Sequence, residues 1–427
     1  MPMTSTFRSL RHPNYRLWFF GQGASLVGTW MQFVAQQLLI YRLTGSAAAL
    51  GTISLIGLIP LIPLSLWSGS LVDRFPKRTV ILVCQAGMMA QALIMAALLF
   101  TDTVQIWHVY VLSFFLGVFN AVDLPARQSI VVELVEGKAD LSNAIGLNSA
   151  LFNLGRALGP AMAGVVVAAT GEAWAFFINA LTFAIFIVAL LFMRNLPAPA
   201  PEARKNNRTA AHMLEGMRFI FKQQTLLILV TLVGVSAFLS MPYSTLMPVF
   251  AGNVLASSAQ PFINTVCTSG LITCLAPEAL PLGLLTGLMG FGALIGALLV
   301  ASLPETAPRG LMLTIGNLGF PALLIGFAFS KSFVTSLVLM FFVGVAFVWQ
   351  NVLANTLIQF ASPDAMRGRV MSFYTMSFQA MMRLGGMQAG LLADGIGAPL
   401  TVGIGAVVSL LYGLFVLLRY PKVRQLQ

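Results

Sequence analysis

The sequence predicts an all-α membrane protein with twelve transmembrane helices in two parallel six-helix repeats. Of its 427 residues, 58% are hydrophobic and only 9% are charged, whereas about a quarter of the residues of a soluble domain carry charge. Apolar runs of about 20 residues, long enough to cross a bilayer core of roughly 30 Å, recur along the chain. The basic residues collect in alternate connections between these runs, as in a protein threaded repeatedly through a membrane.

Each predicted span is an apolar run between polar breaks. In chain order the spans are 17–41, 48–72, 79–101, 104–126, 141–169, 173–193, 225–250, 280–303, 310–330, 332–354, 370–393 and 397–418. Of the 24 lysines and arginines, Arg156 and Arg383 lie within spans, and a cytoplasmic N-terminus leaves only Arg42 and Lys331 outside. The positive-inside rule therefore predicts that both termini are cytoplasmic. The polar start of the chain predicts a retained first helix rather than a cleaved signal peptide.

The domain organisation follows from a polar break in the middle of the chain. We expect an N-terminal six-helix bundle over residues 1–193, a cytoplasmic linker over 194–224 and a C-terminal six-helix bundle over 225–427. Within the linker, residues 209–223 have helical spacing with apolar and basic residues on opposite faces. This pattern suits either a helix lying in the membrane interface or a solvated connector.

Faint internal symmetry supports two repeats. A shift of 227 residues places Phe114–Val118 on Phe341–Val345, and the same shift places Arg156 on Arg383 and Gly159 on Gly386. Parallel repeats of six helices are one architecture of secondary transporters.

The end of span 2 carries a ten-residue motif, Gly-Ser-Leu-Val-Asp-Arg-Phe-Pro-Lys-Arg. It resembles the signature that follows span 2 in the major facilitator superfamily, where a glycine lets helices approach, an acid caps a neighbouring helix and basic residues hold the cytoplasmic side. The matching residues are Gly69, Asp73, Arg74, Lys77 and Arg78, while Pro76 stands where a glycine is common. The resemblance implies a role in conformational switching, and the alternative is a helix end that merely obeys the positive-inside rule.

Several shorter stretches resemble one exporter branch of that superfamily, which includes the enterobactin exporter and macrolide efflux proteins. They are Gly28–Gln32, Pro125–Gln128, Asn143-Ala144, Asn153–Gly164 and Arg367–Val370. The resemblance covers nearly the whole chain except residues 251–279 and the tails. It implies the major facilitator fold, efflux of a small molecule and a place in the bacterial cytoplasmic (inner) membrane.

Small residues at helical spacing predict close helix packing in spans 5 and 11. The residues are Gly155, Gly159, Pro160, Gly164, Gly386 and Gly390. Glycines four apart offer a smooth strip to a neighbouring helix. A bendable span at the interface between the repeats would also serve alternating access, so both interpretations stay open.

Two arginines are predicted near the middle of the bilayer, where a bare charge costs about 2.5–3.5 kcal/mol. Arg156 and Arg383 must therefore face protein or water. They either form a pseudo-symmetric cationic pair that attracts an anionic or polar substrate in a central cavity, or they anchor helices. Uncharged candidates for the cavity wall are Gln32, Gln36, Asn153 and Gln379, although such amides often join helices instead.

Asp123 is the one acid placed well inside a predicted span. It lies one turn before Arg127, so an i, i+4 ion pair explains it. It is also the leading candidate for a proton-coupling carboxylate. The arginine that many proton-coupled drug exporters of this fold have in span 4 would fall near Ser113 and is absent.

The predicted function is a secondary transporter that exports a small amphipathic or anionic molecule by alternating access with proton coupling. The alternatives are a lysolipid or lipid flippase on the same fold and a non-transporting scaffold. An enzyme or a primary transporter is not expected, because the sequence has no phosphate-binding P-loop and its three histidines lack metal spacing. We expect no cofactor, metal or nucleic-acid partner, since the net charge of +11 comes from short basic clusters between spans. The expected partners are the substrate, the bilayer and the coupling proton, and the expected state is a monomer.

The connection over residues 251–279 is longer than its counterpart after span 1. It contains Cys267 and Cys274, and the predicted topology places it on the oxidising side. We therefore predict a disulfide between these two cysteines.

Overall fold

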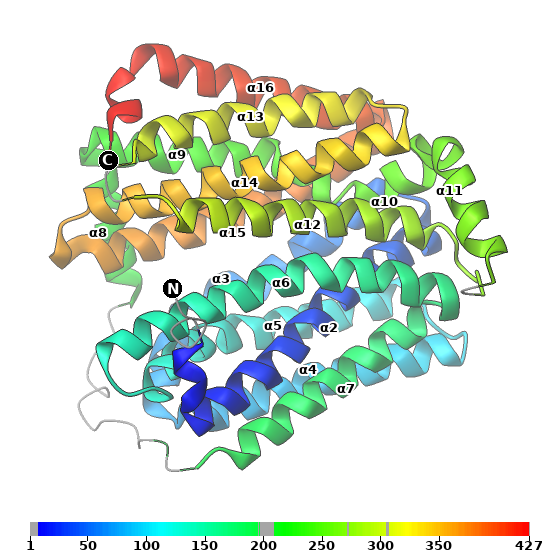
Figure 1. The fold of residues 1–427 in the computed structure, drawn as a ribbon, viewed down its shortest axis with the longest axis horizontal. Coiled ribbons are helices and arrows are strands. Elements are labelled where there is room, and N and C mark those ends of the chain that lie inside the picture. The colour runs from blue at the N-terminus through cyan, green and yellow to red at the C-terminus, as the bar shows by residue number, and fades with distance from the viewer. Residues whose placement is uncertain (1–6, 195, 197–208, 271–272, 305–306, 427) are drawn as a thin grey trace. The chain divides into compact units, whose positions relative to one another are not determined.

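The computed structural model describes residues 7–194, 196, 209–270, 273–304 and 307–426. Within these ranges the ordered elements are all helical, and they form two compact units (Figure 1). The first unit contains residues 1–39, 56–209 and 273–276, and the second contains 40–55, 210–272 and 277–427.

The first unit is built mainly from the helices of the N-terminal half, of which residues 40–55 group with the second unit. They are η1 (Arg8–Arg11), α2 (Pro13–Thr44), α3 (Ala47–Arg74), α4 (Lys77–Phe100), α5 (Ile106–Ile130), η2 (Val131–Glu133), α6 (Lys138–Thr170) and α7 (Glu172–Phe192). Helix α4 packs against α5 and α7, and α6 packs against α7. The core includes the fully buried rings of Trp18, Phe183 and Phe186.

The second unit is built mainly from the helices of the C-terminal half. They are α8 (Thr209–Lys222), α9 (Gln224–Leu239), η4 (Met241–Ser244), α10 (Met247–Val249), η5 (Phe250–Val254), α11 (Ala256–Thr268), α12 (Ala279–Ala301), α13 (Arg309–Phe329), α14 (Phe333–Ala361), α15 (Asp364–Ile396), α16 (Ala398–Arg419) and η6 (Pro421–Gln425). Long helices run side by side in this unit, with α14 against α12 and α13, and α15 against α9 and α16 (Figure 1).

The described residues contain ten helices that are long and apolar enough to cross a membrane. The prediction of an all-α multi-pass membrane protein is thus confirmed, while the number twelve stays a prediction. The other two predicted spans correspond to α2 and α15, which have 32 and 33 residues but are more polar than the rest. Polar transmembrane helices usually face a bundle interior or water rather than lipid.

The predicted seventh span is not one continuous helix. Helix α9 ends at Leu239, and short η4, α10 and η5 segments carry the chain to Val254. Pro242 and Pro248 lie within these short segments. The stretch Gln224–Val254 is long and apolar enough to cross a membrane, in agreement with the span predicted over 225–250. Its α-helix is interrupted within that stretch, because proline cannot donate the backbone hydrogen bond that continues a helix.

The two compact units differ from the predicted bundles at the start of α3. Residues 40–55 group with the second unit, although they precede the middle of the chain. Gly51 and Gly386 bring the two backbones together there, since a Cβ on Gly51 would lie 2.8 Å from the carbonyl oxygen of Gly386. Close backbone contact of this kind requires glycine.

The predicted helix in the linker is present as α8, whereas residues 195 and 197–208 of the linker lie outside the described part. Glu215 of α8 forms an ion pair with Arg369 at 2.5 Å. Gly216 lies against the backbone of Arg369, and Ile220 is buried in the core of the second unit. Helix α8 is therefore packed on α15 along one face.

The long connection after the seventh span folds as helix α11 followed by a return to α6. Cys267 and Cys274 are disulfide-bonded, which confirms the predicted bond, and the third cysteine, Cys84, is free and buried. Just beyond the bond, the backbone N–H of Leu275 donates to the carbonyl of Ala168 at 2.7 Å. The connection thus ends by hydrogen-bonding the last turn of α6.

Candidate functional site

Arg156 lies on a mixed polar and aromatic face of α6. Its guanidinium donates to the side-chain oxygen of Asn153 at 3.0 Å, and Phe152 is one helical turn away on the same face. The Phe152 ring packs edge-on against Trp30, which in turn contacts Phe33. Phe152 and Phe33 are 44% and 47% exposed. A half-buried cation and an amide therefore lie beside rings that are only partly covered by protein.

Arg383 has a different setting on α15 in the second unit. It is half-buried, and its guanidinium approaches the backbone carbonyl of Ser54 at 3.5 Å, a long hydrogen bond. Gln379 lies one turn earlier and is also half-buried. Arg383 and Gln379 therefore share one face of α15 near the start of α3.

The two glutamines of α2 that were candidates for the cavity wall are buried among helices. Gln32 donates to the Gln91 oxygen at 3.0 Å and accepts from Asn179 at 2.6 Å. Gln36 donates to the Ser113 hydroxyl at 2.6 Å. These bonds join α2 to α4, α5 and α7, which favours their interpretation as interhelical ties.

A similar uncharged network lies in the second unit. Gln350 of α14 accepts from Ser236 of α9 at 3.1 Å and donates to Asn317 of α13 at 2.8 Å. All three residues are at least nine-tenths buried. Each unit thus has amide hydrogen bonds between three or more of its helices.

Asp123 and Arg127 form a buried ion pair within α5. Arg127 Nε lies 2.5 Å from one carboxylate oxygen, and Gln85 of α4 donates to the other at 3.0 Å. The guanidinium also reaches the Ser25 hydroxyl at 3.4 Å and lies over the Phe186 ring at 4.8 Å. The i, i+4 geometry expected from the sequence is present, and Gln85 is a partner that the sequence did not reveal.

The motif at the end of α3 makes two sets of contacts in the first unit. Lys77 forms an ion pair with Glu133 at 2.5 Å, and Arg78 donates to the carbonyls of Leu191 and Met193 at the end of α7. These contacts fix the start of α4. Of the other motif residues, Arg74 is exposed, whereas the surroundings of Gly69 and the side chain of Asp73 lie outside the described part of the structure.

The glycine strip of α6 faces α2. A Cβ on Gly159 would lie 2.4 Å from that of Trp30, and one on Gly155 would lie 3.0 Å from that of Leu26. Pro160 and Gly164 are buried in the same helix. On α15, Gly390 is tighter than Gly386, because a Cβ there would lie 2.5 Å from the carbonyl oxygen of Ala47.

Two further acids have many partners that the sequence did not indicate. Asp140, at the start of α6, is 1% exposed and contacts Arg8 and Arg11, each at 2.6 Å, and His12 at 2.8 Å. Asp394, at the end of α15, accepts hydrogen bonds from residues at the start of α3. Both contacts join segments more than 100 residues apart, which a single sequence does not show.

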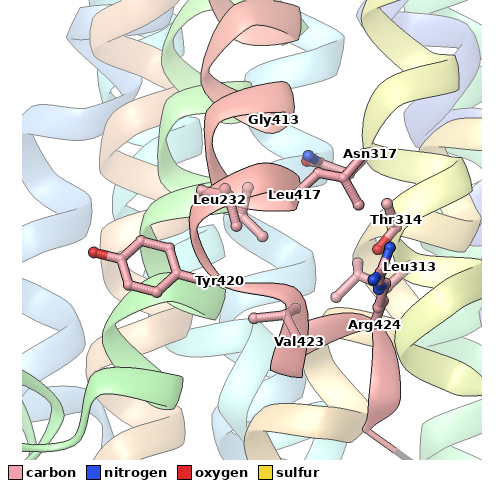
Figure 2. Close-up of a pocket in the computed structure, with 10 residues that line it drawn as sticks. Leu232, Leu313, Thr314, Asn317, Gly413, Leu417, Tyr420, Val423 and Arg424 are labelled. Atoms are coloured by element: carbon pink, nitrogen blue, oxygen red, sulfur yellow. The ribbon is translucent and has the colours of Figure 1, made fainter.

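A small pocket lies at one end of the second unit, between α9, α13, α16 and η6 (Figure 2). Asn317 and Gly413 lie on one side of it, and Val423 and Arg424 lie on the other. Its volume is about 10 Å³, enough for about one water molecule. This pocket is too small for a transported substrate.

Comparison with known proteins decides the family. A family model described as transmembrane secretion effector matches residues 4–426. The chain belongs to this family. The transmembrane secretion effector family is part of the major facilitator superfamily, as the sequence motifs indicated, so the chain is a multi-pass membrane transporter and not an enzyme.

This transmembrane secretion effector has relatives that match most of its length. It is 21% identical to the staphyloferrin A transporter of Staphylococcus aureus, covering 92% of this chain and 93% of the relative. It is 26% identical to the enterobactin exporter EntS of Escherichia coli, covering 93% of this chain and 86% of the relative.

Solved structures show the same fold at low sequence identity. The nucleoside transporter NupG matches with a TM-score of 0.70 and 15% identity, covering 96% of this chain and 99% of NupG. A bacterial homologue of the human lysosomal transporter Spinster matches with a TM-score of 0.65 and 14% identity, covering 99% of this chain and 98% of that homologue.

Proposed function

We propose that this protein exports a small amphipathic, anionic molecule across the bacterial cytoplasmic membrane by alternating access, with proton coupling. The observation that carries the proposal is the face of α6 on which Arg156 and Asn153 lie beside Phe152 and the α2 rings. The relatives named as a staphyloferrin A transporter and an enterobactin exporter support a chelator-like cargo and outward transport. Both termini in the cytoplasm and a monomeric state belong to the same proposal.

The chemistry of this face suits an anion with an aromatic or apolar part. A guanidinium presents a planar fork of donors that matches a carboxylate or a similar planar anion. The neighbouring rings offer flat apolar surface at the same place. A bound anion would also offset the cost of holding a positive charge at this depth of the membrane.

Arg383 is proposed as the second contact for the substrate. Among the described residues, its guanidinium has a long hydrogen bond of 3.5 Å to the backbone carbonyl of Ser54, which leaves donors for a ligand. Its place in the second repeat corresponds to that of Arg156 in the first.

Asp123 is proposed as the carboxylate that exchanges the coupling proton. Its partners are Arg127 and Gln85 within the first unit. Protonation of Asp123 would weaken the ion pair and free the Arg127 guanidinium, which links a proton to a change of contacts inside that unit.

The test is transport by the purified protein in proteoliposomes, with a panel of aryl and citrate-type chelators, cationic dyes and lysolipids. Arg156→Gln should lower chelator transport at least about tenfold, and Arg156→Lys should lower it less, since the charge remains but the fork of donors is lost. Arg16→Gln is the matched control, because Arg16 is an exposed arginine of the same unit.

Folded yield must be measured beside flux. An anchoring role for Arg156 would instead lower the yield of folded protein, because its partners would lose hydrogen bonds that no water replaces. Normal flux and yield in both Arg156→Gln and Arg383→Gln would remove the two arginines from the substrate site. Transport of lysolipids in preference to chelators would favour the flippase alternative.

A further inference from the structure

The carboxylate of Asp394, in the last turn of α15, is bonded to the first turn of α3. One oxygen accepts from the backbone N–H of Ala47 at 2.7 Å. The other accepts from the Ser46 hydroxyl at 2.6 Å and from the backbone N–H of Ala48 at 3.2 Å. Both oxygens of Asp394 thus accept hydrogen bonds, from donors that precede Asp394 by 346 to 348 residues in the sequence.

The two backbone N–H donors, of Ala47 and Ala48, need a partner because they begin a helix. The first N–H groups of an α-helix have no carbonyl within the helix to accept from them. A negative charge at this end is also favoured by the helix dipole. Asp394 therefore accepts from the first two N–H groups of α3, and the Ser46 hydroxyl accepts from the third, that of Ala49.

Glycines bring the two helices close enough for this contact. On α15, Gly390 lies one turn before Asp394 and faces the backbone of Ala47 and Gly51. Gly386, one turn earlier, faces Gly51 and Ser54. Helices α3 and α15 are thus in continuous contact along the first turns of α3, and the Asp394 carboxylate lies at one end of this strip.

We propose that Asp394 is a positioning residue of the transport cycle that caps α3 in one conformation and releases it in the other. The inference rests on the proposed alternating access. Residues 47–55 of α3 group with the second unit and residues from Ile56 onward group with the first. When the repeats move, this helix must lose its contacts with one of them, and we assign that loss to its strip on α15.

The chemistry of the contact suits repeated release. Asp394 is exposed, and its bond with Ser46 is exposed as well, so water replaces the lost hydrogen bonds when the strip opens. Within the described part of the chain, its hydrogen-bond partners are Ser46, Ala47 and Ala48, none of which is cationic. After release, the Asp394 carboxylate and the N–H groups of α3 would therefore be solvated. The charged groups of the buried Asp123–Arg127 pair have no such access to water.

Hydrogen–deuterium exchange of the full-length protein in nanodiscs tests the cap without any substrate. Asp394→Asn replaces one accepting carboxylate oxygen with an amide N–H₂ group, which cannot accept. The exchange rates of the backbone amides of Ala47 and Ala48 should therefore rise about fivefold, as expected for the loss of a typical helix cap. Asp364→Asn is the matched control on the same helix, since the Asp364 side chain is 89% exposed and its ion pair, within the described residues, is with the nearby Arg367. Unchanged exchange in Asp394→Asn would overturn the capping role.

A reversible cross-link tests whether the contact must open. In the double variant Ser46→Cys, Asp394→Cys, oxidation should stop transport and a reductant should restore it to the level of the unoxidised variant. Wild-type protein under the same oxidant and reductant controls for the native disulfide. Full transport by the cross-linked protein would show that the cap is static and would overturn the proposal.

The two measurements separate this inference from the proposed function. If wild-type protein transports no member of the substrate panel, the proposed function fails, while the exchange result still decides whether Asp394 caps α3. If wild-type protein transports and the cross-linked form transports equally well, only the releasable cap fails.

Discussion

The Asp123→Asn substitution should destabilise the first unit because it leaves a buried guanidinium without a counter-charge. Asp123 and Arg127 are only 4% and 8% exposed. Asparagine keeps the size of the side chain and an oxygen for Gln85, so the change removes mainly the charge. Arg127 would keep the distant Ser25 hydroxyl and the Phe186 ring, neither of which is an anion.

The expected loss follows from that geometry. Breaking one side of a buried ion pair costs about 3–5 kcal/mol, and an unpaired charge within a membrane costs about 2.5–3.5 kcal/mol. We take about 3 kcal/mol, which corresponds to a fall of about 6–12 °C in melting temperature for a unit of this size. The double variant Asp123→Asn, Arg127→Gln should recover most of the loss, because no charge then remains buried.

The protein contains its own reporter for this measurement. Cys84 is buried, next to Gln85, and free of the disulfide, so a thiol-reactive fluorophore labels it when the first unit unfolds. Asp102→Asn is the control, since Asp102 is exposed at the end of α4 and its left-handed backbone conformation suits asparagine. A melting temperature within about 2 °C of the wild type in Asp123→Asn would refute the reasoning. A stable double variant that still follows the pH gradient would remove Asp123 as the proton carrier.

Three other outcomes are expected. Gly390→Val should force α3 and α15 apart at a cost of about 1–3 kcal/mol and impair transport. Gly395→Ala should leave transport and melting temperature unchanged, because nothing lies within 4 Å of its added Cβ. Equal transport rates and melting temperatures of the two variants would contradict the close packing. Cys267→Ser should speed limited chymotryptic cleavage of the connection after η5, because the disulfide with Cys274 stabilises the folded loop by about 2.5 kcal/mol. An unchanged cleavage rate would show that the disulfide does not stabilise this connection. A reporter fused after Gln427 should be active on the cytoplasmic side, and activity only outside would overturn the predicted topology.

The helices that are apolar along their whole length were predictable from composition. The span predicted over 280–303 is α12 from Ala279 to Ala301, and the span predicted over 310–330 is α13 from Arg309 to Phe329. The break after Leu239 was missed although Pro242 and Pro248 are visible in the sequence. A hydropathy run measures transfer into lipid and is insensitive to a proline that interrupts the hydrogen-bond ladder.

The partners of the candidate residues were less predictable than the residues themselves. Asp123 and Arg127 are four residues apart, so helical spacing alone predicts their contact. Gln85 and Asp394 gain their roles from helices that are distant in sequence, and no local pattern marks an acid that caps another helix. The burial of Gln32 was predictable, because a polar residue within a span is usually shielded from lipid. The sequence did not reveal whether its side chain faces a cavity or another amide.

The hydrogen-bonded amides between the helices carry no net charge, and this affects how transport depends on the membrane voltage. A unit charge that crosses the whole membrane field does about 2.3 kcal/mol of work for each 100 mV, whereas a neutral amide does none. The hydrogen bonds of Gln32 with Gln91 and of Gln350 with Asn317 can therefore move with their helices at any membrane voltage without energetic cost. The voltage dependence of transport should then report the charged residues, the coupling proton and the cargo. Gln350→Glu would place an ionisable group where the second unit now has a neutral hydrogen-bonded amide.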